Sequence, residues 1–283
     1  LETHCKRPAK TALRLRRKAK GERLKVDEFS SESCMTLPIF IRWPFSFDLE
    51  PLSCPWAFML MDRGPCGRSV PMLNVGLTGG IATGKSTVVR MLVKRGARVI
   101  DHDGLVHALQ EPGQPVWKRI IETFGRDILD ADERIDRKKL GALVFDDEQR
   151  RKALEGIVHP AVLEEAQQQR DEIGRQDEQA IVLSDIPLLL EVGMGELFDL
   201  ILLVYAPPQV QILRVMKRNK MTRDEAEARL RAQMPIDEKL KVADLVIRND
   251  GTMRDLEKSV DEVWQELLSR QRQKRVQGSG SRV

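Results

Sequence analysis

The string Gly79-Gly80-Ile81-Ala82-Thr83-Gly84-Lys85-Ser86 constrains the fold of this chain more than any other feature. It follows the apolar run 73–77 and leads into an amphipathic stretch, 86–95. Glycines let the backbone curl so that successive N–H groups point inward, and the N-terminus of a following helix strengthens their attraction for an anion. The string therefore predicts a strand, a phosphate-binding loop (P-loop) and a helix. The alternative, an ordinary strand-turn-helix, gives Gly-Lys-Ser no packing purpose.

The residues of this loop have distinct expected roles. Lys85 would bridge the β- and γ-phosphates of ATP, and the hydroxyl of Ser86 would bind Mg²⁺, with Thr87 beside it on a phosphate oxygen. We therefore expect ATP and Mg²⁺ as cofactors. The expected cofactor-binding set is Gly80, Ala82, Thr83, Gly84, Lys85, Ser86 and Thr87.

A P-loop indicates what is bound and leaves the reaction open. The nearest string to the GTP-reading motif N-K-x-D is Asn219-Lys220-Met221-Thr222, which lacks the base-reading Asp. The sequence also has no L-S-G-G-Q signature and no second ATPase core. A small-molecule kinase is therefore the most economical class.

Apolar strands alternate with amphipathic helices from Leu73 onward, which predicts an α/β fold with a parallel sheet covered by helices on both faces. The core sheet would occupy residues 73–102 and 180–250. The interval 104–179 is mostly helical and too long for a simple crossover, so we expect a substrate-binding insertion. A lid is expected at about 207–234. The five expected strands are 73–77, 98–101, 180–185, 200–205 and 245–248.

Two further patterns concern helix ends. Thr222 and Glu225 have the spacing of a capping box, in which each side chain satisfies a free N–H group of the other residue. The low-complexity stretch 271–283 is expected to fray.

Residues 1–71 differ in composition from the expected kinase domain, 72–283. Residues 1–72 carry 13 Lys and Arg against 8 Asp and Glu, which leaves 34 against 35 for the remainder. The remainder therefore has no bulk charge that would favour nucleic acid. For the N-terminal extension three interpretations compete: a disordered basic arm, a targeting peptide, or upstream sequence not translated in the natural protein. The opening Leu1 and the position of Met72 directly before the first strand favour the third.

The four cysteines all lie in the first quarter of the chain, without C-x-x-C spacing that would indicate a zinc site. The cysteine-free remainder fits a reducing compartment. The most apolar N-terminal stretch, 35–61, is interrupted by prolines and charges, so no membrane span is predicted. We expect a cytoplasmic monomer that binds neither membrane nor nucleic acid. For the basic N-terminal extension alone, attachment to nucleic acid or to a membrane surface stays open, and a steep loss of binding with salt would be its mark.

Carboxylates follow two of the expected strands. Asp101 and Asp103 end the second strand, at the carboxyl edge where ligands of open α/β sheets bind. Such a group can accept the proton of an attacking hydroxyl or hold Mg²⁺ through water. The alternative is that Asp103 only caps a helix beginning near Gly104. Asp185 ends the third strand like a Walker B residue, where it would help to order the metal shell. The alternative is that it is simply a strand-ending turn residue.

Arg214 and Arg218 are four residues apart and share a helix face within the expected lid. Phosphoryl transfer spreads negative charge over the migrating group, and arginines on a mobile lid can stabilise it. The alternative is a solvated basic face. The position after the fourth strand favours the lid.

Taken in order, these strings resemble the dephospho-coenzyme A kinase family over residues 73 to about 268. The P-loop string alone is shared with many kinases, and its combination with the others is much more specific. The further strings are Asp101-His102-Asp103, Asp136-Arg137 leading to Leu143-Val144-Phe145, His159-Pro160, Pro187-Leu188-Leu189-Leu190-Glu191 and Ala243-Asp244-Leu245-Val246-Ile247-Arg248-Asn249.

The resemblance implies a P-loop kinase fold with a five-stranded parallel sheet, a helical substrate domain and a lid. It implies ATP-dependent phosphorylation of the ribose 3′-hydroxyl of dephospho-coenzyme A, the final step of coenzyme A biosynthesis. Asp103 would be the general base, Asp101 would bind substrate, and Arg214 and Arg218 would stabilise the transferred charge.

His159 would lie on the substrate side, although a histidine at a helix start before Pro160 is the favoured alternative to direct catalysis. Two residues depart from the family pattern. Ala82 replaces a frequent Gly, which should spare the anion-binding loop. His102 replaces the usual Ala between the aspartates and could point outward harmlessly.

Two other functions stay open from the sequence. A nucleoside or nucleotide kinase of the same fold would differ in its acceptor. A regulatory P-loop protein would bind nucleotide without an acceptor reaction, and the two aspartates and the lid arginines argue against it.

Overall fold

The computed structural model describes residues 72–279, with the backbone alone for 277–279. The N-terminal extension, 1–71, and the interpretations made of it lie outside the described residues.

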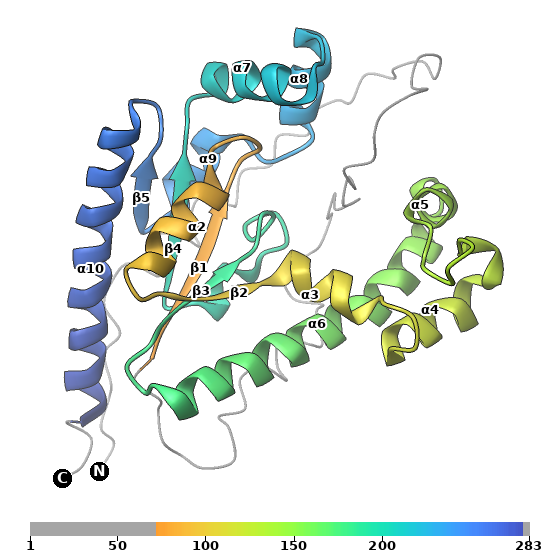
Figure 1. Ribbon diagram of the computed structural model, residues 1–283, viewed down its shortest axis with the longest axis horizontal. Helices are drawn as coiled ribbons and strands as arrows, with labels where there is room; N and C mark the ends of the chain where they lie inside the picture. Colours follow the sequence, from red (N-terminus) through yellow and green to blue (C-terminus); the bar gives the residue numbers. More distant parts are fainter. Residues whose placement is uncertain (1–71, 280–283) are drawn as a thin grey trace, which may run out of the picture. The chain divides into compact units, whose positions relative to one another are not determined.

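The predicted parallel sheet is confirmed, with five strands in the order β2-β3-β1-β4-β5 (Figure 1). Every neighbouring pair is parallel, and Leu77 of β1 and Asp101 of β2 both lie in register with Asp185 of β3. The strand ends that carry the carboxylates therefore meet at one edge. The strands are β1 (Leu73–Gly79), β2 (Arg98–Asp101), β3 (Ile181–Asp185), β4 (Leu200–Tyr205) and β5 (Leu245–Arg248).

Two helices, α2 (Lys85–Lys94) and α10 (Met253–Ser279), cover one face of the sheet. Ile181 and Leu183 of β3 pack into the core beneath these helices, whereas Val182 between them belongs to a second core on the opposite face. This division follows from the alternation of side chains along a strand. Both faces are thus buried, which explains the nearly continuous apolar runs.

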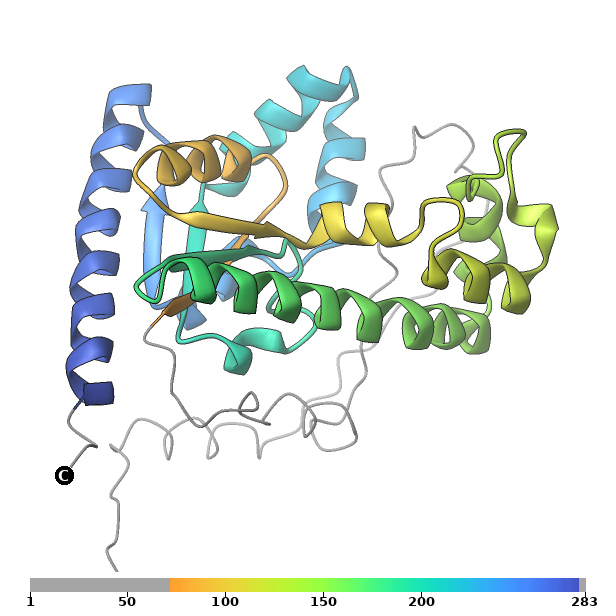
Figure 2. The same ribbon diagram turned by 60° about the horizontal axis from the view of Figure 1, so that its bottom comes forward.

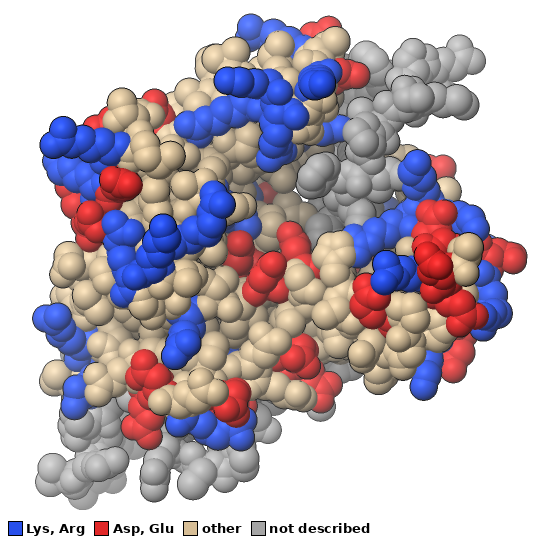
Figure 3. All heavy atoms as spheres, viewed as in Figure 1, with Lys and Arg blue, Asp and Glu red and all other residues tan. Residues whose placement is uncertain are grey.

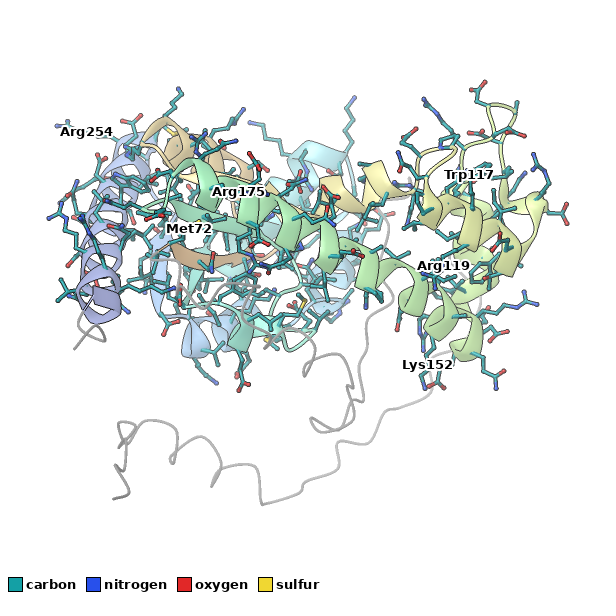
Figure 4. All side chains as sticks on the ribbon, turned by 90° about the horizontal axis from the view of Figure 1, so that it is seen from below. Met72, Trp117, Arg119, Lys152, Arg175 and Arg254 are labelled. Atoms are coloured by element: carbon teal, nitrogen blue, oxygen red, sulfur yellow. The ribbon has the colours of Figure 1, made fainter. Side chains whose placement is uncertain are left out.

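The predicted helical insertion is also observed. It contains α3 (His102–Leu109), α4 (Pro115–Phe124), the 3-10 helix η2 (Arg126–Ile128), α5 (Arg137–Phe145) and α6 (Glu148–Gln176). Figures 2 and 4 show α6 running from this helical region, near the labelled Lys152, to Arg175 beside the sheet. Because Val158 and Val162 of α6 share a core with Ile100 of β2, the region packs directly on the sheet.

The expected lid contains α7 (Pro208–Asn219) and α8 (Arg223–Arg231), and the predicted capping box of Thr222 and Glu225 is present. It is followed by α9 (Ile236–Val242), and the 3-10 helix η3 (Met194–Leu197) precedes β4. Ile212 and Val215 of α7 pack with Ile81 and Ala82 of the P-loop, so the lid rests on the loop.

The fraying expected over 271–283 is wrong for the described part of that stretch, because α10 continues to Ser279. Gln271 is buried, and the ammonium of Lys274 donates to the carbonyl of Met72 (2.8 Å) and to Asp199 Oδ2 (2.6 Å). These long-range contacts hold a segment whose low-complexity composition is typical of a frayed terminus. Among the described residues, no helix is long and apolar enough to span a bilayer.

Candidate active site

The P-loop joins β1 to α2 and has the curled backbone that its glycines predict. Gly84 lies at φ 90°, and a Cβ there would meet the Asn249 amide nitrogen at 2.2 Å, so glycine is required on two grounds. Within the loop, Thr83 is buried and its hydroxyl donates to the carbonyl of Gly80 (2.9 Å). Ser86 is exposed at the start of α2.

Ala82 adopts the left-handed conformation, with φ 56°. A non-glycine residue costs roughly 1–2 kcal/mol in this region. The substitution of alanine for the frequent glycine therefore keeps the turn and leaves the loop strained. The sequence indicated a small change and missed this strain.

Side chains from distant segments hold the loop, and sequence reasoning assigned a role to only one of them. Asn249 Nδ2 donates to the carbonyl of Thr83 (2.7 Å), and the backbone N–H of Ile81 donates to Gln233 Oε1 (3.0 Å). Arg214 of α7 reaches the carbonyl of Ala82 (3.5 Å) and Asn249 Oδ1 (3.4 Å). Asn249 was visible only as part of a family string, and nothing in the sequence marks Gln233.

Lys85 forms an ion pair with Asp185 at the end of β3, and the two side chains are 18% and 14% exposed. Burial raises the pKa of the Asp185 carboxyl, and the adjacent Lys85 ammonium opposes that rise. A strand-end carboxylate thus lies against the phosphate-binding lysine, as in a Walker B arrangement.

The two aspartates after β2 have different surroundings. Asp101 is the N-cap of α3, and its carboxylate accepts the backbone N–H of Gly104 (3.1 Å). The alternative that Asp103 caps this helix is therefore wrong, because the cap lies two residues earlier. Asp103 stands in the first turn; burial raises the pKa of its carboxyl, Lys85 lowers it, and the charges of Asp101 and Asp185 raise it further.

His102, between them, does not point outward. It is 8% exposed, and its Nε2 has no hydrogen-bond partner among the described residues. Burial, together with the charge of Arg170, lowers the pKa of His102 to about 4, against a weaker opposing effect of Asp101. The expectation is wrong because α3 packs on α6, and His102, at the first position of α3, lies against Ala166 and Arg170 of that helix.

The two lid arginines have different positions. Arg214 contacts the P-loop as described, whereas Arg218 is exposed and its Nε donates to Asn219 Oδ1 (2.9 Å). In Figure 3 acidic side chains gather at the centre of this face, below basic side chains of the lid. This distribution suits a site in which cations are brought to a phosphate above a carboxylate base.

His159 lies well inside α6, next to Val158 in the core of the helical region. The interpretation of His159 as a helix-start residue is wrong, because Pro160 lies within the helix. Burial lowers the pKa of the His159 imidazole.

The Glu that ends the P-L-L-L-E string makes structural contacts. Glu191 pairs with Lys239 of α9 (2.7 Å), and its carboxylate also accepts the backbone N–H of Met234 (3.2 Å). The Lys239 side chain is fully buried and donates as well to the carbonyl of Pro187 (3.2 Å). Burial lowers the pKa of Lys239, and Glu191 opposes that shift.

Magnesium was expected at Ser86 and Asp185. Within residues 72–279 no three His, Cys, Asp or Glu side chains gather into a metal cluster. Mg²⁺ in kinase sites takes one or two protein oxygens and fills its shell with water and phosphate oxygens. The hydroxyl of Ser86, which follows Lys85 in sequence, and the carboxylate of Asp185, which pairs with Lys85, are oxygen donors of this kind, so the residues present fit the ion.

A phosphate-binding loop, a lysine-carboxylate pair and a second carboxylate with raised pKa, all at one edge of a parallel sheet, define a P-loop kinase. Comparison with known proteins gives the family. The family model for dephospho-CoA kinase matches residues 73–255, and the chain therefore belongs to that family.

Individual relatives agree with this membership. A dephospho-CoA kinase of Syntrophus aciditrophicus is 46% identical over 217 residues, covering 77% of this chain and 92% of the relative. A dephospho-CoA kinase of Oceanobacillus iheyensis is 44% identical, and the match covers 68% of this chain and 96% of the relative. Among solved structures, TT1252 from Thermus thermophilus is 38% identical with a TM-score of 0.58, covering 69% of this chain and 97% of its own. Dephospho-CoA kinase from Campylobacter jejuni is 29% identical with a TM-score of 0.54, covering 70% and 98%.

Proposed function

We propose that this chain transfers the γ-phosphoryl group of ATP to the ribose 3′-hydroxyl of dephospho-coenzyme A, which yields coenzyme A and ADP in the final step of coenzyme A biosynthesis. Family membership supports the acceptor. The observation that carries the chemistry is that Lys85 pairs with Asp185 while its charge also lowers the pKa of Asp103 against the effect of burial.

The phosphates of ATP bind in the P-loop, where the backbone N–H groups and Lys85 face them. Lys85 then exchanges its contact with Asp185 for the phosphate oxygens. Ser86 and Asp185 are the residues that would hold Mg²⁺, which neutralises phosphate charge when bound. The raised pKa of Asp185 indicates that its buried carboxylate gains from a cation beside it.

Asp103 accepts the proton of the 3′-hydroxyl as the bond between that oxygen and the γ-phosphorus forms. The bond from the γ-phosphorus to the bridging oxygen breaks, and ADP leaves. A carboxyl whose pKa is raised by burial is a better proton acceptor than a free one. Asp101, which caps the start of α3, binds the acceptor ribose.

Arg214 and Arg218 stabilise the charge that spreads over the transferred group. Arg214 already borders the loop, and Arg218 follows one turn later on α7, so a small lid movement would bring both to the phosphates. Residues 207–234 form the lid, and residues 104–179, including His159, form the acceptor-binding region of a kinase domain that spans 72–283. Their cysteine-free sequence supports a cytoplasmic enzyme, which we expect to be a monomer.

The test is ATP-dependent turnover of dephospho-coenzyme A by the full chain, with AMP and adenosine as control acceptors. We expect turnover of dephospho-coenzyme A far above that of either control, and its loss when Mg²⁺ is chelated. Equal activity on AMP would indicate a nucleotide kinase. ATP binding without phosphorylation of any acceptor would favour the regulatory alternative.

A further inference from the structure

Arg137 and His107 meet across the helical region, although 30 positions separate them in sequence. Arg137 Nη1 lies 3.2 Å from His107 Nε2, and Nη2 contacts the other ring nitrogen. The start of α5 is held by Asp136, whose carboxylate accepts the backbone N–H groups of Lys138 (2.8 Å) and Lys139 (3.3 Å). Arg137 is therefore held in place at the first position of its helix. The catalytic steps described above do not use it.

This pair lies on the active-site side of α3. Asp103 and His107 are four residues apart and share one helix face, and the charge of His107 acts on the Asp103 carboxyl. One helical turn, about 5.4 Å, separates positions four apart. The Arg137-His107 pair thus stands about one turn from the candidate base.

The surroundings favour an anion. Arg137 is half-buried, and within residues 72–279 it makes no ion pair, so its guanidinium faces an imidazole instead of a carboxylate. It lines a hollow with His107, Glu111, Asp130 and Arg134.

The two carboxylates of this hollow are already engaged. Glu111 pairs with Arg134 (3.8 Å), and Asp130 Oδ1 accepts two backbone N–H groups of its own turn, those of Asp132 and Arg134 (2.9 Å each). The two carboxylates formally balance the two arginines of the hollow, and the charge of Glu111 raises the pKa of Arg137 against the effect of burial. Arg137 is the arginine of the hollow that makes no ion pair within residues 72–279, so its guanidinium has N–H donors to offer an anion.

We propose that Arg137, with His107, binds the 5′-diphosphate of the acceptor nucleotide. The proposal rests on the function proposed above and deepens it. One helical turn is about 5.4 Å, a span that a ribose can bridge between its 3′-oxygen and its 5′-phosphate, so a 3′-hydroxyl at Asp103 allows the diphosphate to reach this pair. A planar guanidinium offers parallel N–H donors that match phosphate oxygens. The pair would thereby select a nucleotide acceptor over a nucleoside.

The first experiment compares the full-length protein with Arg137→Gln, Arg137→Lys and a matched control, Arg126→Gln, which removes an exposed arginine of the same region paired with Glu133. In Arg137→Gln the KM for dephospho-coenzyme A should rise roughly 10- to 100-fold, with the KM for ATP within about twofold of wild type. The KM of Arg137→Lys for dephospho-coenzyme A should lie between those of wild type and Arg137→Gln, because lysine keeps the charge and loses the paired N–H donors of the guanidinium. Arg126→Gln should behave as wild type.

The second experiment separates binding from folding and from the choice of acceptor. Inorganic pyrophosphate is titrated calorimetrically into each protein while a non-hydrolysable ATP analogue fills the P-loop. Wild type and Arg126→Gln should bind it, and Arg137→Gln should bind at least about tenfold more weakly.

An unchanged KM for dephospho-coenzyme A in Arg137→Gln, or equal rises in both KM values, would overturn the subsite and leave a structural contact between α3 and α5. Failure of the wild type to phosphorylate dephospho-coenzyme A would instead refute the proposed function. Loss of pyrophosphate binding in Arg137→Gln would still support the subsite in that case, and equal binding by both proteins would overturn it.

Discussion

Two lysine-carboxylate pairs take their carboxylates from the end of β3 and from the segment that follows it, and they differ in access to ligand. Lys85 and Asp185 are 18% and 14% exposed, whereas Lys239 is fully buried against Glu191, which is 10% exposed. Lys239 and Glu191 also bond to the carbonyl of Pro187 and the N–H of Met234. The first pair can exchange partners when nucleotide arrives, and the second holds the chain in place. A lysine-carboxylate pair therefore indicates a binding site only when a ligand can reach it.

The largest contrast is expected from the matched variants Lys85→Met and Lys239→Met. Lys85→Met should lower kcat by roughly 10²–10³ or more, because its charge acts on the reacting phosphoryl group. Its melting temperature should fall less than that of Lys239→Met, because both members of the Lys85-Asp185 pair are partly exposed. Lys239→Met should keep most of its kcat where it is folded. Steady-state kinetics with a thermal melt on both proteins checks this, and a catalytic loss in Lys239→Met as large as in Lys85→Met would erase the distinction.

Asp103→Asn sharpens the comparison on the reacting side, with a predicted fall in kcat of roughly 10²–10⁴ because the proton acceptor is removed. The raised pKa of Asp103 also predicts the pH profile. Wild-type activity should fall as pH drops through that pKa, which lies above the usual range of an aspartate, since protonation removes the base. The variant's residual activity should lack this acid limb. Near-normal turnover by Asp103→Asn would refute its assignment as base.

The buried pair of Lys239 and Glu191 should affect the free energy of unfolding instead of kcat. Lys239→Met leaves Glu191 buried without its partner, and breaking a buried pair in this way costs about 3–5 kcal/mol. The double variant Lys239→Met/Glu191→Leu should recover much of that loss, because neither charge is then buried. Denaturant unfolding of the single and double variants measures the difference, and a single variant as stable as wild type would argue that Glu191 reaches water.

The adjacent residues His102 and Asp103, at the start of α3, show the same contrast between an effect on stability and an effect on catalysis. His102 has a pKa of about 4 when folded and 6.5 when free, so below pH 6.5 the unfolded chain binds a proton that the folded chain does not. Stability is therefore lost as pH falls from 6.5 to about 4, by about 3 kcal/mol in all. His102→Ala should remove that part of the pH dependence. Urea unfolding of both proteins at pH 7 and pH 5 checks this prediction. An equal change in the free energy of unfolding between the two pH values in wild type and His102→Ala would contradict it.

The smallest effect is expected at Ala82. Ala82→Gly relieves a positive φ and raises chain entropy in the unfolded state, so the net gain in stability should be at most about 1 kcal/mol. Its kcat should be unchanged. A clear loss of stability would mean that the left-handed conformation is not strained.

Local sequence determined much of this protein. The apolar runs placed five strands, the glycines and Gly84-Lys85-Ser86 placed the P-loop, and Thr222 and Glu225 placed a helix start. Each of these signals acts between neighbours in the chain, through side-chain period, positive φ or a capping bond, so a reader of the sequence can recover it.

The tertiary structure decided what depends on neighbours distant in sequence. Asp101 took the cap expected of Asp103, His102 turned inward, and α10 continued through a segment that looked frayed. Gln233 and Asn249 came to hold the P-loop from more than 150 residues away, and Arg137 met His107. Burial and long-range partners fix these outcomes, and neither is visible in the local residue pattern, whose own preferences are worth no more than about 1 kcal/mol per residue.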